Sequence, residues 1–413
     1  MSPPKLIGSV SLNWKEHDVG ANASMSKTMQ QTDWLALCRL ASSLRADVPC
    51  APLDYVTNGM NNMVRILRFE DGVLWVARVA LRRSPNDMAK LRSEIDTMLW
   101  IRQQSSLPVP EIFAYEVDEN NAVGAPFILM PFVPGNTAVD ACGGWDTHHG
   151  VIPVAHRPRF YRDVTACHVQ MASLRLPKIG TIRKTTDGKF EAGPIPKIGG
   201  PFDTATDFFT AWADAIEFPH SPEKIRELMR GAPETELVLR SVESFPSRFR
   251  ALAPRLVRRN KRDTDRGPFP LCHPDFYQSN VIIDETNFDV LAIIDWEGAC
   301  TLPLELVQFP CFLNLMPPRL CRSEAYNADG QLYDQDDRQR LRERCEYVEM
   351  VQAHEAVQQE SGAGGDHMLS ACLSDKVAQD MSYIMSAFQD GKMGIYDNVL
   401  DDLEKELARD SDL

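Results

Sequence analysis

Short apolar runs separated by turn-forming residues dominate the first third of the chain. Residues 63–69 and 73–80 are rich in Val, Ile and Leu, and the Asp-Gly pair between them is a strong signal for a β-hairpin turn. Residues 112–117 and 125–130 have the length and composition of two further strands. The pattern therefore predicts a small antiparallel sheet in this region.

Elsewhere the apolar residues recur every three or four positions, which is typical of helices. Residues 1–50 contain one such pattern, at 33–44, and are predicted to form an N-terminal extension with one helix. Further helices are predicted at 84–103 and 159–174, in an inserted block at about 200–262, and at 338–359, 374–388 and 396–408. The chain thus divides into a sheet-containing part over 51–132 and a mostly helical part over 133–413.

A second hairpin is predicted within 271–298. Two short runs, 281–284 and 290–295, are rich in Val and Ile and are separated by a polar break. Asn280 stands just before the first run and Asp295 ends the second, while Asp275 lies on the preceding loop. The hairpin therefore brings two carboxylates and one amide to the same end.

These three side chains are the type that phosphoryl transfer requires. Magnesium prefers oxygen ligands and is usually held by one or two protein groups together with substrate phosphates. We expect Asn280 and Asp295 to bind the metal and Asp275 to orient the acceptor hydroxyl and take its proton. The spacing of His273, Asp275 and Asn280 matches a kinase catalytic loop, in which we expect His273 to brace the loop.

The same motifs carry a family resemblance. His273-Pro-Asp275 with Asn280, followed by Ile294-Asp295-Trp-Glu297, resembles the aminoglycoside phosphotransferase and choline kinase group. The Asp-Trp-Glu variant and the helical insertion resemble its fungal branch. The resemblance implies an α+β, protein-kinase-like two-lobed fold, with a small antiparallel sheet in the N-lobe and a mostly helical C-lobe. It also implies transfer of the γ-phosphate of ATP to a hydroxyl of a small molecule, with ATP and Mg²⁺ as cofactors.

The resemblance assigns roles to an ion pair in the first part of the chain. Arg78 stands on the predicted third strand, where kinases place a lysine that holds the ATP phosphates. Glu94, on the helix at 84–103, is the expected partner of Arg78. Asp87 and Asp96 on the same helix compete for that role. Arginine also binds phosphate, but its side chain is planar and longer, so arginine and lysine are not equivalent at this position.

Two further segments are expected to contact the nucleotide. The turn that contains Asn58 and Gly59 would cover the phosphates and offer backbone N–H groups. Residues 130–135 would form the hinge, where Met130 and Phe132 meet the adenine and the backbone of 131–133 binds it.

Composition narrows the functional classes. The 413 residues are 44% hydrophobic and 25% charged, which is typical of a globular protein, and no apolar run is long enough to cross a membrane. The net charge of −14 argues against nucleic acid as a partner. The ten cysteines include no Cys-x-x-Cys pair, and the N-terminus has no export signal, so we expect a cytoplasmic protein with reduced thiols. The expected partner is a small hydroxylated molecule, and the oligomeric state stays open.

Two alternatives remain open from the sequence. A nucleotide-binding pseudokinase with a regulatory role is suggested by Arg78 and by the glycine-poor turn at 58–62. An enzyme that transfers a nucleotide, or that couples phosphorylation to elimination in a biosynthetic pathway, could use the same side chains. The sequence does not identify the acceptor, because Pro274 and residues 277–279 depart from the usual form of the motif.

Overall fold

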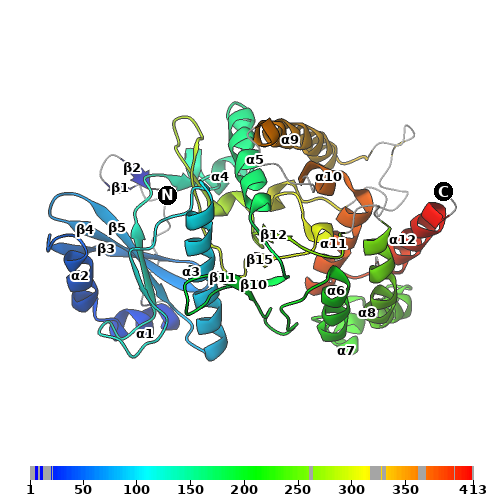
Figure 1. The fold of residues 1–413 in the computed structure, drawn as a ribbon, viewed down its shortest axis with the longest axis horizontal. Helices are drawn as coiled ribbons and strands as arrows, with labels where there is room; N and C mark the ends of the chain where they lie inside the picture. The colour runs from blue at the N-terminus through cyan, green and yellow to red at the C-terminus, as the bar shows by residue number, and fades with distance from the viewer. Residues whose placement is uncertain are drawn as a thin grey trace. The chain divides into compact units, whose positions relative to one another are not determined.

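The computed structural model describes residues 22–259, 264–316, 332–360, 369–394 and 396–411, the short segments 5–7 and 10–12, and residues 20 and 327. The chain forms two compact units (Figure 1). Unit 1 comprises Met1–Cys167 and His273–Ala299, and unit 2 comprises His168–Cys272 and Cys300–Leu413. The hairpin that carries the candidate site therefore belongs to the same unit as the N-terminal sheet. This division differs from the predicted one at residue 132.

The N-terminal region contains more structure than the predicted single helix. A two-stranded sheet of β1 (Lys5–Ile7) and β2 (Val10–Leu12) precedes two helices, α1 (Ala23–Gln31) and α2 (Trp34–Ser43). The prediction of one helix is wrong, because α1 has a mostly polar sequence that buries only Met25 and Thr28. Its start is fixed instead by the Asn22 side chain, which accepts hydrogen bonds from two backbone N–H groups of the first turn.

The predicted antiparallel sheet is confirmed and has five strands in the order β3-β4-β5-β7-β6. Its strands β3, β4 and β5 are labelled in Figure 1. The strand bounds are β3 (Cys50–Asn58), β4 (Asn62–Phe69), β5 (Leu74–Ala80), β7 (Phe127–Pro131) and β6 (Ala114–Glu116). Neighbouring strands are antiparallel throughout, and Val64 of β4 lies opposite Arg78 of β5. This register places Arg78 in the middle of the sheet.

The two faces of this sheet have different partners. Trp75, Ala77 and Val79 of β5 belong to a buried core that also contains residues of α1 and α2. Because side chains alternate along a strand, Arg78 points to the opposite face. There it meets α3 (Pro85–Gln104), a long helix that begins with a capping box at Ser84.

The rest of unit 1 surrounds the hairpin that carries the candidate site. The strands β13 (Val281–Ile283) and β14 (Val290–Ile293) pair with each other, and β8 (Asn136–Thr137) extends them into a three-stranded sheet. The 3₁₀ turns η2 (Ala141–Gly143) and η3 (Gln278–Asn280), the short helix α4 (Trp145–His148) and the helix α5 (Arg157–Ser173) complete this region; α5 continues into unit 2.

Unit 2 is mostly helical. Its strands β9 (Arg175–Leu176), β10 (Gly180–Lys184), β11 (Phe190–Gly193), β12 (Phe269–Cys272) and β15 (Cys300–Thr301) form a sheet in the order β11-β10-β15-β12-β9. Its helices are α6 (Ala205–Ala215), α7 (Pro222–Leu228), α8 (Thr235–Arg258), α9 (Gln335–Glu360), α10 (Leu369–Ser374), α11 (Lys376–Gln389) and α12 (Tyr396–Ser411), with 3₁₀ turns η4 (Leu304–Leu306) and η5 (Cys311–Leu313).

One aromatic core joins the inserted helices to the C-terminal ones. Phe245 and Phe249 of α8 are fully buried, and Phe245 stacks on Phe388 of α11 at 4.7 Å. The helix α8 is continuous although Pro246 and Pro254 lie inside it. The α+β class, with a small antiparallel sheet in one part and mostly helices in the other, is confirmed. No helix among the described residues is long and apolar enough to span a bilayer.

Candidate active site

His273 holds the start of the catalytic loop. It is buried, and its Nε2–H donates to the Ile294 carbonyl at 3.0 Å while its Nδ1 accepts the Asp275 backbone N–H at 3.1 Å. Burial lowers the pKa of His273, which keeps the imidazole neutral and preserves this donor–acceptor pattern. His273 therefore braces the loop, as expected, by tying the backbone of Asp275 to the end of β14.

Asp275 and Asn280 are in direct contact. The Asn280 side-chain Nδ2 donates to the Asp275 carbonyl at 2.8 Å and to its Oδ2 at 3.0 Å. Asn280 is buried, whereas Asp275 is exposed and so accessible to a solvent-borne acceptor. The amide thus fixes the Asp275 carboxylate and turns its own Oδ1 away from that contact.

Asp295 is presented by an unusual backbone. It has a φ of +64°, a left-handed conformation that non-glycine residues rarely adopt. Its neighbour Trp296 is fully buried and donates through Nε1 to the Ile293 carbonyl at 3.0 Å, so the carboxylate of Asp295 points away from the core and is 47% exposed. The backbone N–H of Ile294 donates to the Asn280 carbonyl at 2.9 Å, which places Asp295 next to Asn280.

The donor set fits a magnesium ion that also binds phosphates. Among the described residues, no three His, Cys, Asp or Glu side chains are arranged to enclose a metal ion by themselves. Magnesium does not need such a cage, because it is commonly held by one or two protein oxygens plus phosphate and water. The Asp295 carboxylate and the Asn280 Oδ1 offer that number of ligands.

The predicted ion pair between Arg78 and Glu94 is present. Arg78 Nη1 lies 2.7 Å from Glu94 Oε1, and the Glu94 side chain is only 1% exposed. Burial raises the pKa of Glu94, and the charge of Arg78 opposes that shift. Burial alone would lower the pKa of Arg78, but Glu94 and Asp295 outweigh it and raise the pKa. Asp87 caps α3 instead of binding Arg78.

Arg78 also connects this pair to the candidate metal site. Its Nη2 lies 3.9 Å from Asp295 Oδ1. A single guanidinium therefore faces the buried Glu94 on one side and the exposed Asp295 on the other. A phosphate placed near Asp295 would come within reach of the same guanidinium.

The turn at Asn58 and Gly59 differs in detail from the prediction. The Gly59 N–H donates to the Asn62 carbonyl at 3.0 Å, so this N–H group is not available to a phosphate. That the turn covers the phosphates stays a prediction. A Cβ on Gly59 would meet no atom within 4 Å. The Asn58 Nδ2 donates to the Gly59 carbonyl at 2.8 Å, while its buried Oδ1 has no partner.

The predicted hinge also needs a correction. The Phe132 N–H donates to the Leu74 carbonyl at 3.1 Å, which extends the pairing of β7 with β5, where Met130 lies opposite Val76. Phe132 therefore does not offer its N–H to an adenine. Proline has no N–H, so of the predicted segment 131–133 only Val133 retains a donor for that purpose.

Phe132 contributes its side chain instead. It packs, partly buried, in a small apolar cluster around Ile66, whose other members are Leu53, Leu74 and Val76. Leu74, Val76 and Arg78 alternate along β5 and so lie on one face of the sheet. The cluster is thus an apolar surface beside the Arg78 guanidinium, and a nucleotide requires an apolar surface for its base together with polar or charged groups for its phosphates.

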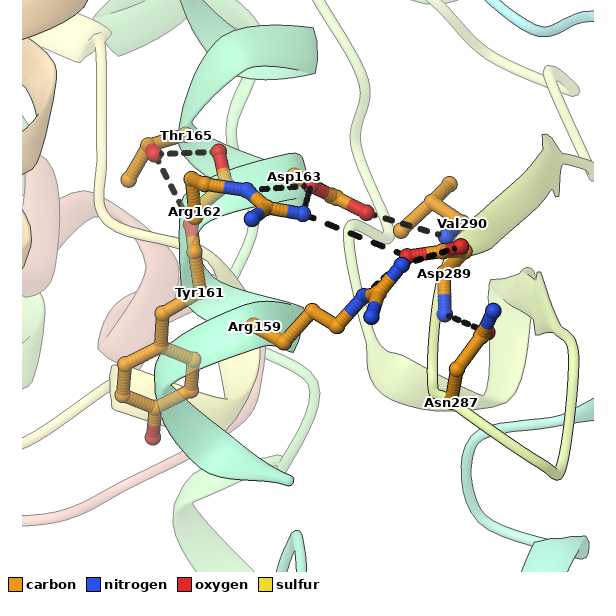
Figure 2. A network of polar contacts seen from close by, with 8 residues as sticks. All are labelled: Arg159, Tyr161, Arg162, Asp163, Thr165, Asn287, Asp289 and Val290. Atoms are coloured by element: carbon orange, nitrogen blue, oxygen red, sulfur yellow. Dashed lines mark hydrogen bonds and ion pairs between the residues drawn. The ribbon is translucent and has the colours of Figure 1, made fainter. Parts of the chain in front are cut away.

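The turn of the catalytic hairpin is attached to α5 by a charged network (Figure 2). Arg159 binds both carboxylate oxygens of Asp289, and Arg162 reaches the same carboxylate at 3.9 Å while pairing with Asp163 at 2.8 Å. Asp163 in turn accepts the Val290 backbone N–H at 3.4 Å. The hairpin is therefore held at its turn by Asp289 and at its open end by His273.

Two features of the site escaped the sequence analysis. Phe288, in the segment treated as a polar break, is fully buried, adopts a φ of +60° and stacks on His156 at 4.4 Å. Glu297 accepts a hydrogen bond from the Asn61 side chain at 2.8 Å, across 236 residues of sequence. Neither contact leaves a local pattern in the sequence.

The sequence matches a family model that decides the classification. The model, described as the phosphotransferase enzyme family, matches residues 56–305, more than half of the chain. The chain belongs to this phosphotransferase family. The matched range includes the sheet, the Arg78–Glu94 pair and the catalytic hairpin, and the predicted resemblance to aminoglycoside phosphotransferases is confirmed.

Curated relatives of this phosphotransferase come from fungi. A subtelomeric hrmA-associated cluster protein of Aspergillus fumigatus is 24% identical over 306 residues, which cover 62% of this chain and 58% of that protein. The Altered inheritance of mitochondria protein 9, mitochondrial, of Komagataella phaffii is 27% identical over 276 residues, or 57% of this chain and 44% of that protein. The chain thus spans about half the length of these relatives.

Solved structures with a similar trace include a thermostable mutant of the aminoglycoside phosphotransferase APH(4)-Ia. It has a TM-score of 0.41 and 16% identity, and the match covers 91% of this chain and 99% of that one. A macrolide 2'-phosphotransferase type I has a TM-score of 0.39 and 16% identity, covering 89% and 96%.

Proposed function

We propose that this phosphotransferase moves the γ-phosphate of ATP to a hydroxyl group of a small molecule in a magnesium-dependent reaction. The observation that carries the proposal is the contact of Asp275 with Asn280, next to the exposed carboxylate of Asp295. An exposed, oriented carboxylate beside two oxygen ligands is the minimum that such a transfer needs from a protein.

Asp275 acts on the acceptor. Its carboxylate accepts a hydrogen bond from the acceptor hydroxyl and orients the oxygen for attack on the γ-phosphorus. It takes the proton as the new bond to phosphorus forms and the bond from phosphorus to the bridging oxygen of ATP breaks, which releases ADP. The Asn280 amide holds this carboxylate in place at 3.0 Å. The charged form of Asp275 is required, because a protonated carboxyl would donate rather than accept a hydrogen bond.

Arg78 and the apolar cluster act on the nucleotide. Arg78, held by Glu94, neutralises phosphate charge next to Asp295. The surface formed by Val76, Phe132 and their neighbours would receive the adenine, and the Val133 N–H would donate to its ring edge. A magnesium ion held by Asn280 and Asp295 would supply charge neutralisation for the phosphates.

Mass spectrometry of the products tests the proposal. The purified protein is incubated with ATP, Mg²⁺ and a panel of hydroxylated metabolites, with Asp275→Asn as the inactive control. A product that gains one phosphate supports the proposal. A gain of one nucleotide, or loss of water, indicates one of the other transfer reactions, and nucleotide binding without any product indicates a pseudokinase.

The acceptor and the compartment are separate questions. The acidic chain, with a net charge of −14, mildly favours a neutral or cationic acceptor. A cytoplasmic location stays a prediction, and the yeast relatives carry the word mitochondrial in their names. Cell fractionation of the tagged protein, with markers of both compartments, distinguishes the two locations.

A further inference from the structure

Glu297 lies two residues after the candidate metal ligand Asp295 and has no role in the mechanism above. Trp296 between them is fully buried, whereas both carboxylates are partly exposed. The Glu297 side chain is 21% exposed, whereas that of Asp295 is 47% exposed. The two acids therefore have different surroundings although they leave the same short segment.

Both oxygens of Glu297 are engaged by other parts of unit 1. Oε2 accepts a hydrogen bond from the Asn61 side-chain Nδ2 at 2.8 Å, and Oε1 lies 3.6 Å from the Lys90 Nζ. Asn61 belongs to the turn between β3 and β4, and Lys90 belongs to α3. One carboxylate thus joins the catalytic hairpin to a turn and a helix that are distant in sequence.

The Asn61 end of this connection is a tight turn. Its ends are closed by the Gly59 N–H on the Asn62 carbonyl at 3.0 Å, and the Asn61 carbonyl accepts the Leu81 N–H at 2.9 Å. A displacement of the Asn61 side chain would therefore move the whole turn. The sequence predicts that this turn covers the ATP phosphates.

The Lys90 end belongs to the helix that also positions Arg78. Lys90 and Glu94 are four residues apart on α3 and so lie on the same helical face. Glu94 binds Arg78 at 2.7 Å, while Lys90 faces Glu297. Ion pairs thus connect the helix to the hairpin segment 295–298, and the Asn61 hydrogen bond connects the turn to the same segment.

We infer that Glu297 is a positioning residue that fastens the phosphate-covering turn at 58–62 to the metal-binding segment through Asn61, with Lys90 balancing its charge. The inference rests on the proposed function for its meaning. It assigns Glu297 no metal: with both oxygens engaged, it would have to release Asn61 or Lys90 to become a ligand. The fastened turn is the state that binds ATP.

Kinetics of six variants, one of them a control, test the inference. Glu297→Ala and Asn61→Ala should each raise the KM for ATP about tenfold, as expected for loss of one hydrogen bond to a charged group, with a much smaller effect on kcat. The double variant should be no worse than Glu297→Ala, because Glu297→Ala already removes the contact with Asn61. Glu297→Gln keeps an acceptor oxygen for Asn61 but loses the ion pair with Lys90, so its KM for ATP should equal that of Lys90→Met. Asn120→Ala, an exposed asparagine in a different turn, is the matched control and should leave the KM unchanged.

A magnesium titration separates this role from metal binding. If Glu297 fastens the turn, Glu297→Ala leaves the Mg²⁺ concentration for half-maximal activity unchanged. A large rise in that concentration for Glu297→Ala, together with a normal Asn61→Ala variant, would show that Glu297 is a metal ligand and would overturn the inference. Additive effects in the double variant would do the same.

Hydrogen exchange tests the fastening without any activity. In the nucleotide-free protein, Glu297→Ala and Asn61→Ala should speed exchange of the Gly59 and Leu81 amides, whose acceptors lie in the turn. The Gly124 amide, which donates to the Asn121 carbonyl in a separate turn, should be unaffected. Unchanged exchange at Gly59 and Leu81 would refute the fastening, whereas a wild-type protein that transfers no phosphate would refute only the proposed function.

Discussion

The ion pair between Arg78 and Glu94 gives a prediction for both stability and nucleotide binding. Glu94→Gln removes one charge but keeps the shape and one acceptor oxygen. The Glu94 side chain is 1% exposed and that of Arg78 is 13% exposed, so the remaining guanidinium would be left largely buried. Loss of one partner from a buried pair costs about 3 kcal/mol or more in the free energy of unfolding. The nearest remaining acid is Asp295 at 3.9 Å.

The same change should weaken ATP binding. Without Glu94, the Arg78 guanidinium is drawn toward Asp295. The guanidinium then competes with the metal for the Asp295 carboxylate, and this carboxylate competes with the phosphates for the guanidinium. We expect a lower denaturation midpoint in urea at an unchanged slope, together with a raised KM for ATP. Glu111→Gln is the matched control in the same unit. Its ion pair with Arg102 is 3.8 Å long and solvent-exposed, so its removal should change stability by less than about 0.5 kcal/mol.

A double variant distinguishes the two consequences. Arg78→Met with Glu94→Gln removes both charges together, and such replacements of a buried pair are often neutral for stability. We therefore expect the double variant to recover most of the lost stability but none of the lost ATP affinity. A Glu94→Gln variant as stable as the wild type, or a double variant that binds ATP normally, would refute this reasoning.

Further predictions concern single residues. Asp275→Asn should reduce turnover by about two orders of magnitude, or about 3 kcal/mol of barrier, with the KM for ATP unchanged in steady-state assays. Glu305 is buried in unit 2, one of its oxygens has no partner, and burial raises its pKa to about 7 from an ordinary 4.5. The folded protein therefore loses stability as the pH rises from about 4.5 through 7, and Glu305→Gln should be more stable than the wild type at pH 8 by about 3 kcal/mol, with little difference at pH 4, in urea unfolding. Burial lowers the pKa of His168 to about 3, so stability should fall as the pH drops below about 6.5, and His168→Gln should flatten that part of the stability–pH curve. Asp289→Asn should detach the hairpin turn from α5 and speed hydrogen exchange at Val290, with a smaller effect at Ile294.

The sequence predicts those elements and contacts whose residues lie close together in the chain and form a local pattern. The strands of the main sheet follow from alternating Val, Ile and Leu, and α3 follows from its periodicity and its Ser84 cap. The partner of Arg78 was predicted because α3 follows β5 directly and Glu94 lies on its inner face. The loop from His273 to Asn280 was predicted because its polar spacing is itself the signal.

The remaining features depend on contacts between distant segments. Helix α1 has too few apolar residues to show a periodic face, and it packs on the core through the buried Met25. Phe288 is buried because the turn places it against His156, which its polar neighbours conceal. The link of Asn61 to Glu297 joins residues 236 positions apart, and no local rule predicts such a pair. The Phe132 N–H was misassigned because strand pairing, which fixes its partner, is a property of the folded sheet.

The most direct test of the central claim follows labelled phosphate from [γ-³²P]ATP in the presence of Mg²⁺ and a hydroxylated metabolite pool. The wild-type protein should pass the label to a small molecule, Asp275→Asn should bind ATP but pass on almost none, and Asp295→Asn should also require more Mg²⁺. Undiminished label transfer in both variants would contradict the assignment of Asp275, Asn280 and Asp295 as the reacting centre.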